Sequence, residues 1–347
     1  MPRFDQDRER FVSRIDRRRR WAHRRYWLES KMRQPARGIQ AAVYDASFRS
    51  DAEAVAYFYA VANDHMPDFI EPVWINEKIR WQFLRHRNPL MSLAADKIAV
   101  REYLLHKQAR VAAPAMIATG AAPDELLAVD LPARFVLKTA HGSGQIRIVD
   151  GTTPVPRPEL VRQLGAWAEF DQWRHTGELH YRDVPHRWLV EEYVPATREK
   201  LEFKVFCFHG EPAFISVITD RDGDAYSRVI FDTDWRRVPF GSRGRAHDPR
   251  PVPRPADLDR VLALARLLSE DFLHVRVDFL KFDGRLVFSE LTFANLAARI
   301  PFEPVEMNAE LGAKIDLGRA AEALAKGRRI AADLGWPRVA EAAPWAA

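Results

Sequence analysis

The pattern of apolar and polar positions divides the chain into a helical first third and a later part rich in strands. In the first third, apolar residues recur at helical spacing, and small polar residues stand where helices would begin. Proline and alanine then accumulate over 112–123, which predicts a boundary. The predicted helices cover 52–62, capped by Ser50 or Asp51, 74–87, with Asn76 a possible cap, and 92–107, capped by Ser92.

After this boundary, short runs of two-residue alternation predict strands joined mainly through hairpins. This pattern indicates an α+β protein with two sheet-containing lobes. The motifs GxGxxG and GxxxxGK[ST] are absent, which excludes Rossmann and P-loop nucleotide sites. Strands are predicted at 134–139, 145–149, 187–193, 202–208, 213–219, 228–231, 274–282 and 285–291, and helices at 158–173, 255–268 and 305–326.

The composition limits the class of protein. With 347 residues, 47% of them hydrophobic, the chain can bury a large core. The single cysteine, Cys207, excludes a disulfide framework and a cysteine-rich zinc site. No apolar run approaches the roughly 20 residues that span a bilayer, and MPRFDQDRER lacks the apolar stretch of a signal peptide. We therefore expect a soluble cytoplasmic protein.

Positive charge is concentrated near the N-terminus. The net charge is +5, and the stretch from Arg17 to Arg25 carries much of the excess. With Trp21, Tyr26 and Trp27 it could contact anionic lipid, as a peripheral membrane segment, or nucleic acid. The favoured alternative is a solvated helix that packs its aromatic side chains on the protein body, because charge runs are usually solvated faces. No RNA-binding or zinc-finger signature accompanies the stretch, so no specific nucleic-acid partner is expected.

The first candidate for chemistry is FVLKTAHGSG, residues 135–144. Lys138 lies near the end of a predicted buried strand, and the turn His141-Gly142-Ser143-Gly144 follows. Backbone N–H groups of such a turn can surround phosphate oxygens, and the lysine adds a charge beside them. Its glycines allow close approach of the backbone. An ordinary glycine hairpin with a surface lysine is the alternative.

Two further predicted strands carry unexpected charges. In LVEEYV, one of Glu191 and Glu192 could accept a hydrogen bond from an adenine amine while the backbone reads the adenine edge. Two solvated edge charges are the alternative. In EFKVFCF, Glu202 and Lys204 point to one face of the strand. A lysine among three phenylalanines indicates an anion opposite it.

The last candidate is the predicted hairpin 274–292. Arg276 and Asp278 share one strand face, as do Glu290 and Thr292. Whether the two pairs share the same face depends on the number of residues in the turn.

A two-residue turn at Asp283-Gly284 would separate Asp278 from Glu290, whereas a three-residue turn with Gly284 left-handed would place both on one face, with Glu290 opposite Arg276. We predict the three-residue or an otherwise bulged turn. The two carboxylates would then converge on magnesium, which prefers a few carboxylates plus phosphates and water. A salt bridge between Arg276 and Glu290 without a metal is the alternative.

In this order, the motifs resemble those of the ATP-grasp enzymes, most closely the TupA-like branch associated with teichuronopeptide and other polysaccharide biosynthesis. The resemblance covers roughly 72–304. It implies an ATP-grasp fold of the α+β class, in which two sheet-containing lobes clamp magnesium-ATP. The implied domains are a helical N-terminal region with the basic segment (1–110), a central lobe (111–195), a C-terminal lobe (196–330) and a tail (331–347). The resembling motifs are INEK (75–78), ADKIAVREYL (95–104), LPARFVLKTAHGSG (131–144), LVEEYV (189–194), FKVFCFHGEP (203–212), VRVDFL (275–280) and FSELTF (288–293).

The resemblance also implies residue roles. One departure is that many ATP-grasp ligases have an asparagine two residues after the second metal carboxylate, where this chain has Thr292. The implied phosphate contacts are Lys97, Lys138 and the turn His141, Gly142, Ser143, Gly144, with Lys204 at the terminal phosphate. For the nucleoside, the resemblance implies contact of Glu191 with the adenine amine, of the backbone of Glu192, Tyr193 and Val194 with the adenine edge, and of Glu202 with the ribose. It also implies magnesium binding by Asp278 and Glu290 and stabilisation of an oxyanion by Arg276.

The implied activity is that of an ADP-forming carboxylate–amine ligase acting through an acyl phosphate, with small-molecule or glycan-linked substrates. A phosphotransferase acting on a hydroxyl and a nucleotide-binding adaptor without turnover remain alternatives. The motifs contain lysines, arginines and carboxylates, which suit phosphoryl transfer by positioning and charge. Cys207 is expected to be a core residue. Arg101, Arg221 and Arg299 are candidates to face an anionic substrate.

Overall fold

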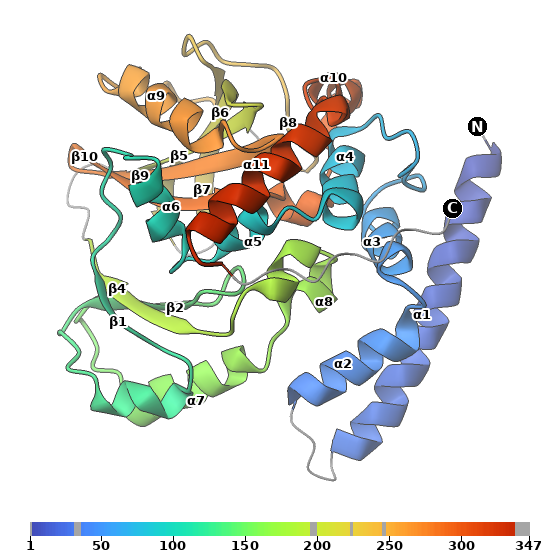
Figure 1. Ribbon diagram of the computed structural model, residues 1–347, viewed down its shortest axis with the longest axis horizontal. Helices are drawn as coiled ribbons and strands as arrows, with labels where there is room; N and C mark the ends of the chain where they lie inside the picture. The colour runs from blue at the N-terminus through green and yellow to red at the C-terminus, as the bar shows by residue number, and fades with distance from the viewer. Residues whose placement is uncertain (1, 31–35, 195–199, 223–224, 245–247, 337–347) are drawn as a thin grey trace. The chain divides into compact units, whose positions relative to one another are not determined.

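The computed structural model describes residues 2–30, 36–194, 200–222, 225–244 and 248–336, and the chain forms two compact units (Figure 1). Each unit is assembled from separate stretches of the chain. The helical region predicted for 1–110 is divided between them. Of the predicted tail, 331–347, residues 331–333 continue a helix and those beyond 336 lie outside the described residues. Unit 1 consists of Met1–Pro72, Ala115–Tyr193 and Leu296–Pro301, and unit 2 of Val73–Pro114, Val194–Asn295 and Phe302–Ala347.

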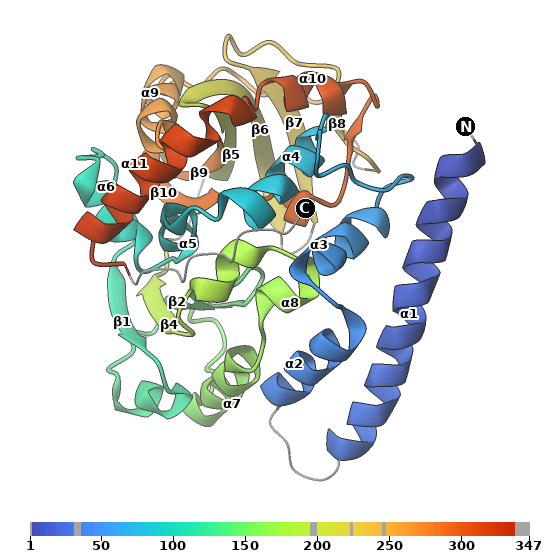
Figure 2. The same ribbon diagram turned by 45° about the vertical axis from the view of Figure 1, so that its right-hand side comes forward.

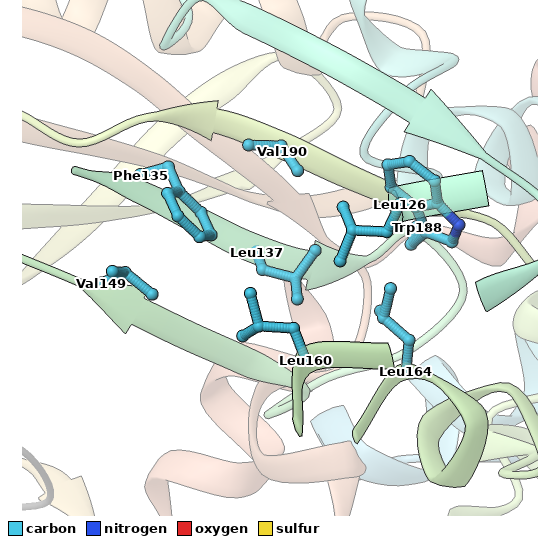
Figure 3. Close-up of a cluster of buried hydrophobic side chains, with 8 residues drawn as sticks. All are labelled: Leu126, Phe135, Leu137, Val149, Leu160, Leu164, Trp188 and Val190. Carbon is cyan, nitrogen blue, oxygen red and sulfur yellow. The ribbon is translucent and has the colours of Figure 1, made fainter. Parts of the chain in front are cut away.

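Unit 1 contains a four-stranded antiparallel sheet in the order β1-β4-β2-β3. Figure 3 shows the apolar core on one side of this sheet, formed by side chains from β2, β3 and β4 and from two helical segments. The elements are β1 (Met116–Gly120), η2 (Pro123–Ala128), β2 (Phe135–Thr139), β3 (Ile146–Val149), α7 (Arg157–Ala168) and β4 (Trp188–Glu192).

Because side chains alternate along β2 and β4, the residues between the core residues point to the opposite face of this sheet. Leu137 and Val190 point into the core and are fully buried. Their strand neighbours Lys138 and Glu191 therefore point to the opposite face. The hairpin predicted across 140–144 is confirmed, with Lys138 of β2 paired with Ile146 of β3.

Unit 1 also contains a group of helices at the N-terminal end of the chain (Figure 2). Ser50 caps α3 as predicted, because its Oγ accepts the backbone N–H of Glu53 at 3.1 Å. Buried residues from α1, α2 and α3 form a second core with Trp173 packed against it. The elements are α1 (Pro2–Ser30), α2 (Ala36–Ser47), α3 (Asp51–Ala60), α8 (Gln172–Thr176) and η3 (Leu179–Asp183).

Unit 2 is built on a five-stranded antiparallel sheet in the order β10-β9-β5-β6-β7. Helix α9 (Leu258–Ser269) packs on β5, β6 and β9 and contributes buried leucine, valine and alanine side chains. The opposite face carries the charged residues described below. The strands are β5 (Lys200–Phe208), β6 (Glu211–Asp222), β7 (Ala225–Asp232), β9 (His274–Phe282) and β10 (Arg285–Thr292), and β8 (Gly241–Ser242) pairs with β11 (Phe302–Glu303) in a small separate sheet.

Several predicted helices are shorter than expected. The helix predicted from Ser92 begins instead at Pro89, because Asn88 Oδ1 accepts the N–H of Leu90 at 3.0 Å, and it stops before Asp96. Asn76 does not cap the helix that begins at Ile75, since Glu77 Oε2 accepts the N–H groups of Val73 and Trp74 at its N-terminal end. The elements are α4 (Ile75–Trp81), a π-helical turn η1 (Gln82–His86), α5 (Pro89–Ala95) and α6 (Val100–His106).

Two other predicted helices are each divided in two. The stretch predicted as one helix over 305–326 is interrupted where Asp316 Oδ1 accepts the N–H of Gly318 at 2.9 Å. The stretch 158–173 ends at Ala168 and resumes at Gln172. No described helix combines the length and the apolar character needed to cross a membrane. The remaining elements are α10 (Met307–Ala313), η5 (Leu317–Arg319) and α11 (Ala320–Asp333).

Candidate active site

One face of the unit 2 sheet carries a row of charged side chains across three strands. Lys204 of β5 pairs with Asp278 of β9, and Asp278 pairs with Glu290 of β10. Side chains paired in this way have Cβ atoms roughly 4.5–5.5 Å apart. A cation and two carboxylates are thus immediate neighbours on the face opposite α9.

A β-bulge in β10 brings Glu290 to this face. The turn itself has two residues, since Phe282 pairs with Arg285, and Asp283 (φ 47°) and Gly284 (φ 83°) are both left-handed. The register then shifts between Phe288 and Glu290. The predicted three-residue or bulged turn is therefore wrong, because the extra residue is accommodated within the strand.

The bulge also changes the predicted neighbours. Glu290 lies opposite Asp278, and Arg276 lies opposite Thr292. The expected sharing of one face by Arg276, Asp278 and Glu290 nevertheless holds, because a one-residue shift reverses the side-chain parity that a two-residue turn would impose.

Replacing Gly284 with valine is expected to lower stability while leaving the magnesium dependence of turnover unchanged. A β-branched residue in the left-handed region should cost on the order of 2 kcal/mol of unfolding free energy. The space around a Cβ at Gly284 is open, so the penalty is confined to the backbone. Urea unfolding and a magnesium titration of ADP release measure the two effects. A changed magnesium dependence would show that the turn, and not the bulge, sets the position of Glu290.

Arg276 is the centre of the polar network on this face. Its Nε donates to Asp278 Oδ1 at 2.7 Å and its Nη2 to Asp278 Oδ2 at 2.6 Å, a bidentate pair. Nη1 donates to Asn295 Oδ1 at 2.7 Å, and Nη2 also lies 3.1 Å from Thr292 Oγ1. The guanidinium is 3.8 Å from Glu290, so the expected alternative of an Arg276–Glu290 bridge is the weaker contact. Four contacts on three segments fix the orientation of this side chain.

Asp278 is a buried carboxylate held between two cations. Lys204 Nζ donates to Asp278 Oδ2 at 3.0 Å, and Lys204 also lies 3.5 Å from Glu202. Burial alone would raise the pKa of Asp278, but the charges and hydrogen bonds of Arg276 and Lys204 outweigh it and hold the pKa below its ordinary value. Asp278 is therefore held in its ionised form, with Arg276 and Lys204 as its counter-charges.

The donor set on this face suits magnesium. Asp278 and Glu290 are hard oxygen ligands on adjacent strands, and the Glu290 side chain is 38% exposed with a hydroxyl donor, Thr292, at 3.2 Å. Within the described part of the chain, no group of three or more His, Cys, Asp and Glu side chains has the arrangement of a metal site. Two carboxylates are nevertheless the usual protein contribution where phosphates and water complete the shell of Mg²⁺.

In unit 1, Lys138 and Glu191 form an ion pair on the face of the sheet that points away from α7. Both side chains are largely buried. Glu192, the next residue, donates its N–H to Ala115 O at 2.9 Å, so this N–H is already used within the protein and cannot contact an adenine edge. Tyr193 and Val194 are partly exposed.

The same face of unit 1 exposes apolar side chains that the motifs did not predict. Ile146 pairs with Lys138 and is 49% exposed, and Ile148 pairs with Val136 and is 55% exposed. They share the face of Lys138 and Glu191. Exposed isoleucines beside a buried ion pair combine an apolar wall with polar groups, which is the usual composition of a ligand site.

The turn 141–144, which was predicted to bind phosphate, begins with a histidine that stacks on a second histidine. His141 is buried and stacks on His186 with ring centroids 3.8 Å apart. His186 Nδ1 lies 2.9 Å from Ala168 O, and its Nε2 lies 3.1 Å from Asp171 Oδ1. Gly144 adopts φ 81° and Ser143 is exposed.

Lys97, Arg101 and Arg299 lie outside the strands of the two main sheets. Lys97 follows Asp96, whose Oδ1 accepts the N–H groups of Ile98 and Ala99 and so fixes the turn between α5 and α6. Arg101 donates to Pro114 O at 2.7 Å, which makes it a support for the backbone. Arg299 belongs to unit 1, and the side chain of Arg221 lies outside the described residues.

Sequence reasoning missed Asn295 and His186. Asn295 stands three residues after Thr292 and supplies the amide that the expected position lacks, so a search beyond the fixed two-residue spacing would have found it. His186 is 45 residues from His141 in sequence, and no local spacing connects them.

Cys207 is a core residue, as expected. It is fully buried on β5, and burial raises the pKa of its thiol to about 12. Because the thiolate is the nucleophilic form, this side chain cannot serve as a nucleophile near neutral pH.

Comparison with solved structures gives distant similarity to several ligases. The D-alanine–D-alanine ligase from Helicobacter pylori is 12% identical, with 65% of this chain and 61% of that chain covered and a TM-score of 0.37. The phosphoribosylamine–glycine ligase from Thermotoga maritima is 14% identical, with 69% of this chain and 56% of that chain covered and a TM-score of 0.38. The L-amino acid ligase from Bacillus licheniformis is 14% identical, with 60% of this chain and 44% of that chain covered and a TM-score of 0.38. The chain thus spans less than two thirds of each of them. Similarity at this level adds nothing to the assignment.

A search of curated proteins found no match. The family described as TupA-like ATPgrasp matches residues 77–316, which is more than half of the chain and includes every residue of the unit 2 row and of the Lys138–Glu191 pair. The predicted α+β architecture with a helical N-terminal part is confirmed by the two antiparallel sheets and the helices before them. The chain belongs to the TupA-like ATP-grasp family.

Proposed function

We propose that this protein is an ADP-forming ligase that joins a carboxylate to an amine through an acyl phosphate. The observation that carries the proposal is the Lys204–Asp278–Glu290 row with Arg276 held beside it. The row combines a cation for a phosphoryl group with two magnesium ligands. Such an arrangement suits phosphoryl transfer, in which positioning and charge do most of the work.

Magnesium-ATP is the proposed nucleotide substrate. In unit 2, Asp278 and Glu290 would hold Mg²⁺, Lys204 would contact the terminal phosphate and Glu202 the ribose. The metal would neutralise charge on the phosphates. Lys97 is proposed as a further phosphate contact, although its position in the turn before α6 is the only structural support for it.

The unit 1 face is proposed to bind the nucleotide base and inner phosphates. Lys138 and the turn 141–144 would contact phosphate oxygens, while Glu191 would accept from the adenine amine. The exposed side chains of Ile146 and Ile148 would cover a face of the adenine ring. His186 would hold His141 of this turn in place through ring stacking.

The proposed reaction has two steps. A carboxylate oxygen of the substrate attacks the terminal phosphorus of ATP, and the bond to the bridging oxygen breaks with release of ADP. The nitrogen of the amine then attacks the acyl carbon, phosphate leaves, and the amine loses a proton. Arg276, oriented by Asp278 and Asn295, would stabilise the oxyanion formed in the second step. We further propose a product of the cell-surface polysaccharide or peptide-like class, on the ground of family membership alone.

Isotope transfer tests this proposal. ADP release is screened over pairs of carboxylates and amines, and the active carboxylate is then labelled with ¹⁸O. An acyl phosphate intermediate transfers one ¹⁸O atom to inorganic phosphate. A phosphorylated hydroxyl product without free phosphate would replace the ligase by a phosphotransferase. Nucleotide binding without ADP release under any pair would support the adaptor alternative.

A further inference from the structure

Helix α1 presents a stripe of arginines to solvent. Arg10, Arg14, Arg17, Trp21 and Arg24 follow one another at steps of three or four residues, which places them on one face of the helix, and all five are exposed. At 1.5 Å per residue, the stripe is about 21 Å long. It lies outside the stretch that matches the family, so the core of the ATP-grasp fold does not account for it.

The opposite face of α1 uses its charges within unit 1. Ile15 and Ala22 are fully buried. Arg18 Nη1 donates to Glu53 Oε1 at 3.0 Å. Arg19 lies 5.1 Å from the centre of the Tyr57 ring, where it can make a cation–π contact. The inward arginines therefore have structural roles, and the outward ones are additional to what the fold requires.

Acidic residues are scarce along the C-terminal half of the stripe. The sequence contains no Asp or Glu between Asp16 and Glu29. Asp16 itself is turned toward Tyr57, whose hydroxyl donates to it at 2.6 Å. Arg14 forms an ion pair with Glu53 at 3.8 Å, whereas Arg17 makes no ion pair among the residues described by the structure. A run of exposed arginines with so few counter-charges fits an anionic surface.

Trp21 indicates which kind of anionic surface fits. Its side chain is 55% exposed within the arginine stripe, and the Arg25 guanidinium lies 5.3 Å from its ring centre. The expectation that Trp21 packs on the protein body is therefore wrong. An indole has a large apolar ring and a single N–H donor, a combination that is stable at the interface between lipid headgroups and acyl chains.

We infer that the outward face of α1 binds the surface of a membrane containing anionic phospholipid. The straight stripe matches a flat array of lipid phosphates, and Trp21 enters the interface between headgroups and chains. The partner is anionic lipid rather than nucleic acid, because a single indole in the middle of a linear stripe suits a continuous apolar layer better than separate bases. This binding is independent of the proposed ligase chemistry.

The test is co-sedimentation of the full chain with lipid vesicles. Binding is expected with vesicles of phosphatidylcholine and phosphatidylglycerol, not with phosphatidylcholine alone, and it should weaken as salt is added. Arg20 is also exposed and lies one helical turn from both Arg17 and Arg24. The variant R17E/R20E/R24E should lose about 100-fold in affinity, since each arginine near an anionic surface contributes roughly fivefold or more. Trp21→Ala should reduce binding several-fold without changing the salt dependence.

A matched variant controls for net charge. R162E/R328E/R329E alters three exposed arginines on α7 and α11 and changes the net charge by the same amount. It should bind vesicles like the wild-type protein. Equal losses in both triple variants, or no vesicle binding by the wild-type protein, would overturn the inference. Tighter binding to a DNA or RNA oligonucleotide, abolished by R17E/R20E/R24E, would also overturn it and assign the stripe to nucleic acid.

Discussion

Asp278→Asn is expected to lower ATP-dependent turnover by about 10³-fold. The neutral amide is a poorer ligand for Mg²⁺ than a carboxylate, and developing charge on the phosphates then loses part of its stabilisation. The variant also removes the counter-charge of Arg276 and Lys204, which both donate to this carboxylate. ADP release measured over a range of magnesium concentrations should show both a lower maximum rate and a higher magnesium requirement.

Loss of stability could imitate this result, since removing one partner of a buried ion pair costs about 3–5 kcal/mol. Glu290→Gln separates the two effects. Its side chain is 38% exposed, so the unfolding free energy should change by no more than about 0.5 kcal/mol, while the second carboxylate of the proposed magnesium site is lost. Glu290→Gln with normal magnesium dependence would remove the metal from this face of the sheet. Asp257→Asn, which breaks the 2.9 Å pair with Lys281 of β9, serves as the matched control and should retain turnover.

Lys138→Met should lower kcat/KM for ATP by about 10²- to 10³-fold. The substitution removes a cation proposed to contact phosphate while keeping much of the side-chain volume, and a charge-assisted contact in a water-poor site is worth a few kcal/mol. The same change leaves Glu191, which is only 4% exposed, without its lysine partner, and should therefore also lower the melting temperature. Initial rates over a series of ATP concentrations give the kinetic effect.

The double variant K138M/E191Q distinguishes catalysis from folding at this pair. Neutralising both partners should restore most of the lost stability but none of the lost kcat/KM. Lys281→Met, which removes a lysine from another strand ion pair, should leave kcat/KM within about twofold of the wild-type value. Recovery of turnover in K138M/E191Q would mean that Lys138 acts only to balance Glu191.

The sequence correctly predicted the elements that are set by interactions between residues close together in the chain. Ser50 was predicted to cap a helix because its side chain reaches a backbone N–H three residues away, and the structure contains that bond. The hairpin across 140–144 followed from alternating side chains on both sides of a glycine-bearing turn. The family was also accessible from sequence, because the motifs that resemble it occur as an ordered series of short segments along the chain.

Local rules failed where several groups compete for the same backbone atoms. Ser92 is a good capping residue, but Asn88 and Pro89 begin the helix four residues earlier and leave Ser92 buried within it. The stretch 305–326 has a continuous helical pattern, yet Asp316 binds the N–H of Gly318 and interrupts it. In each case a specific side-chain hydrogen bond outweighs a weak average propensity.

Some features of the candidate site follow from the sequence alone, and others depend on the tertiary structure. The sequence indicated that Asp278 and Glu290 lie on two strands of one hairpin, but it left the number of residues in the turn open and the predicted three-residue turn was wrong. Only the tertiary structure decided that they meet, because the register shift before Glu290 depends on how β10 packs beside β9 and on its bridge to Ala112. The same holds for Asn295 and His186, whose partners are fixed by the path of the chain in space and not by spacing along it.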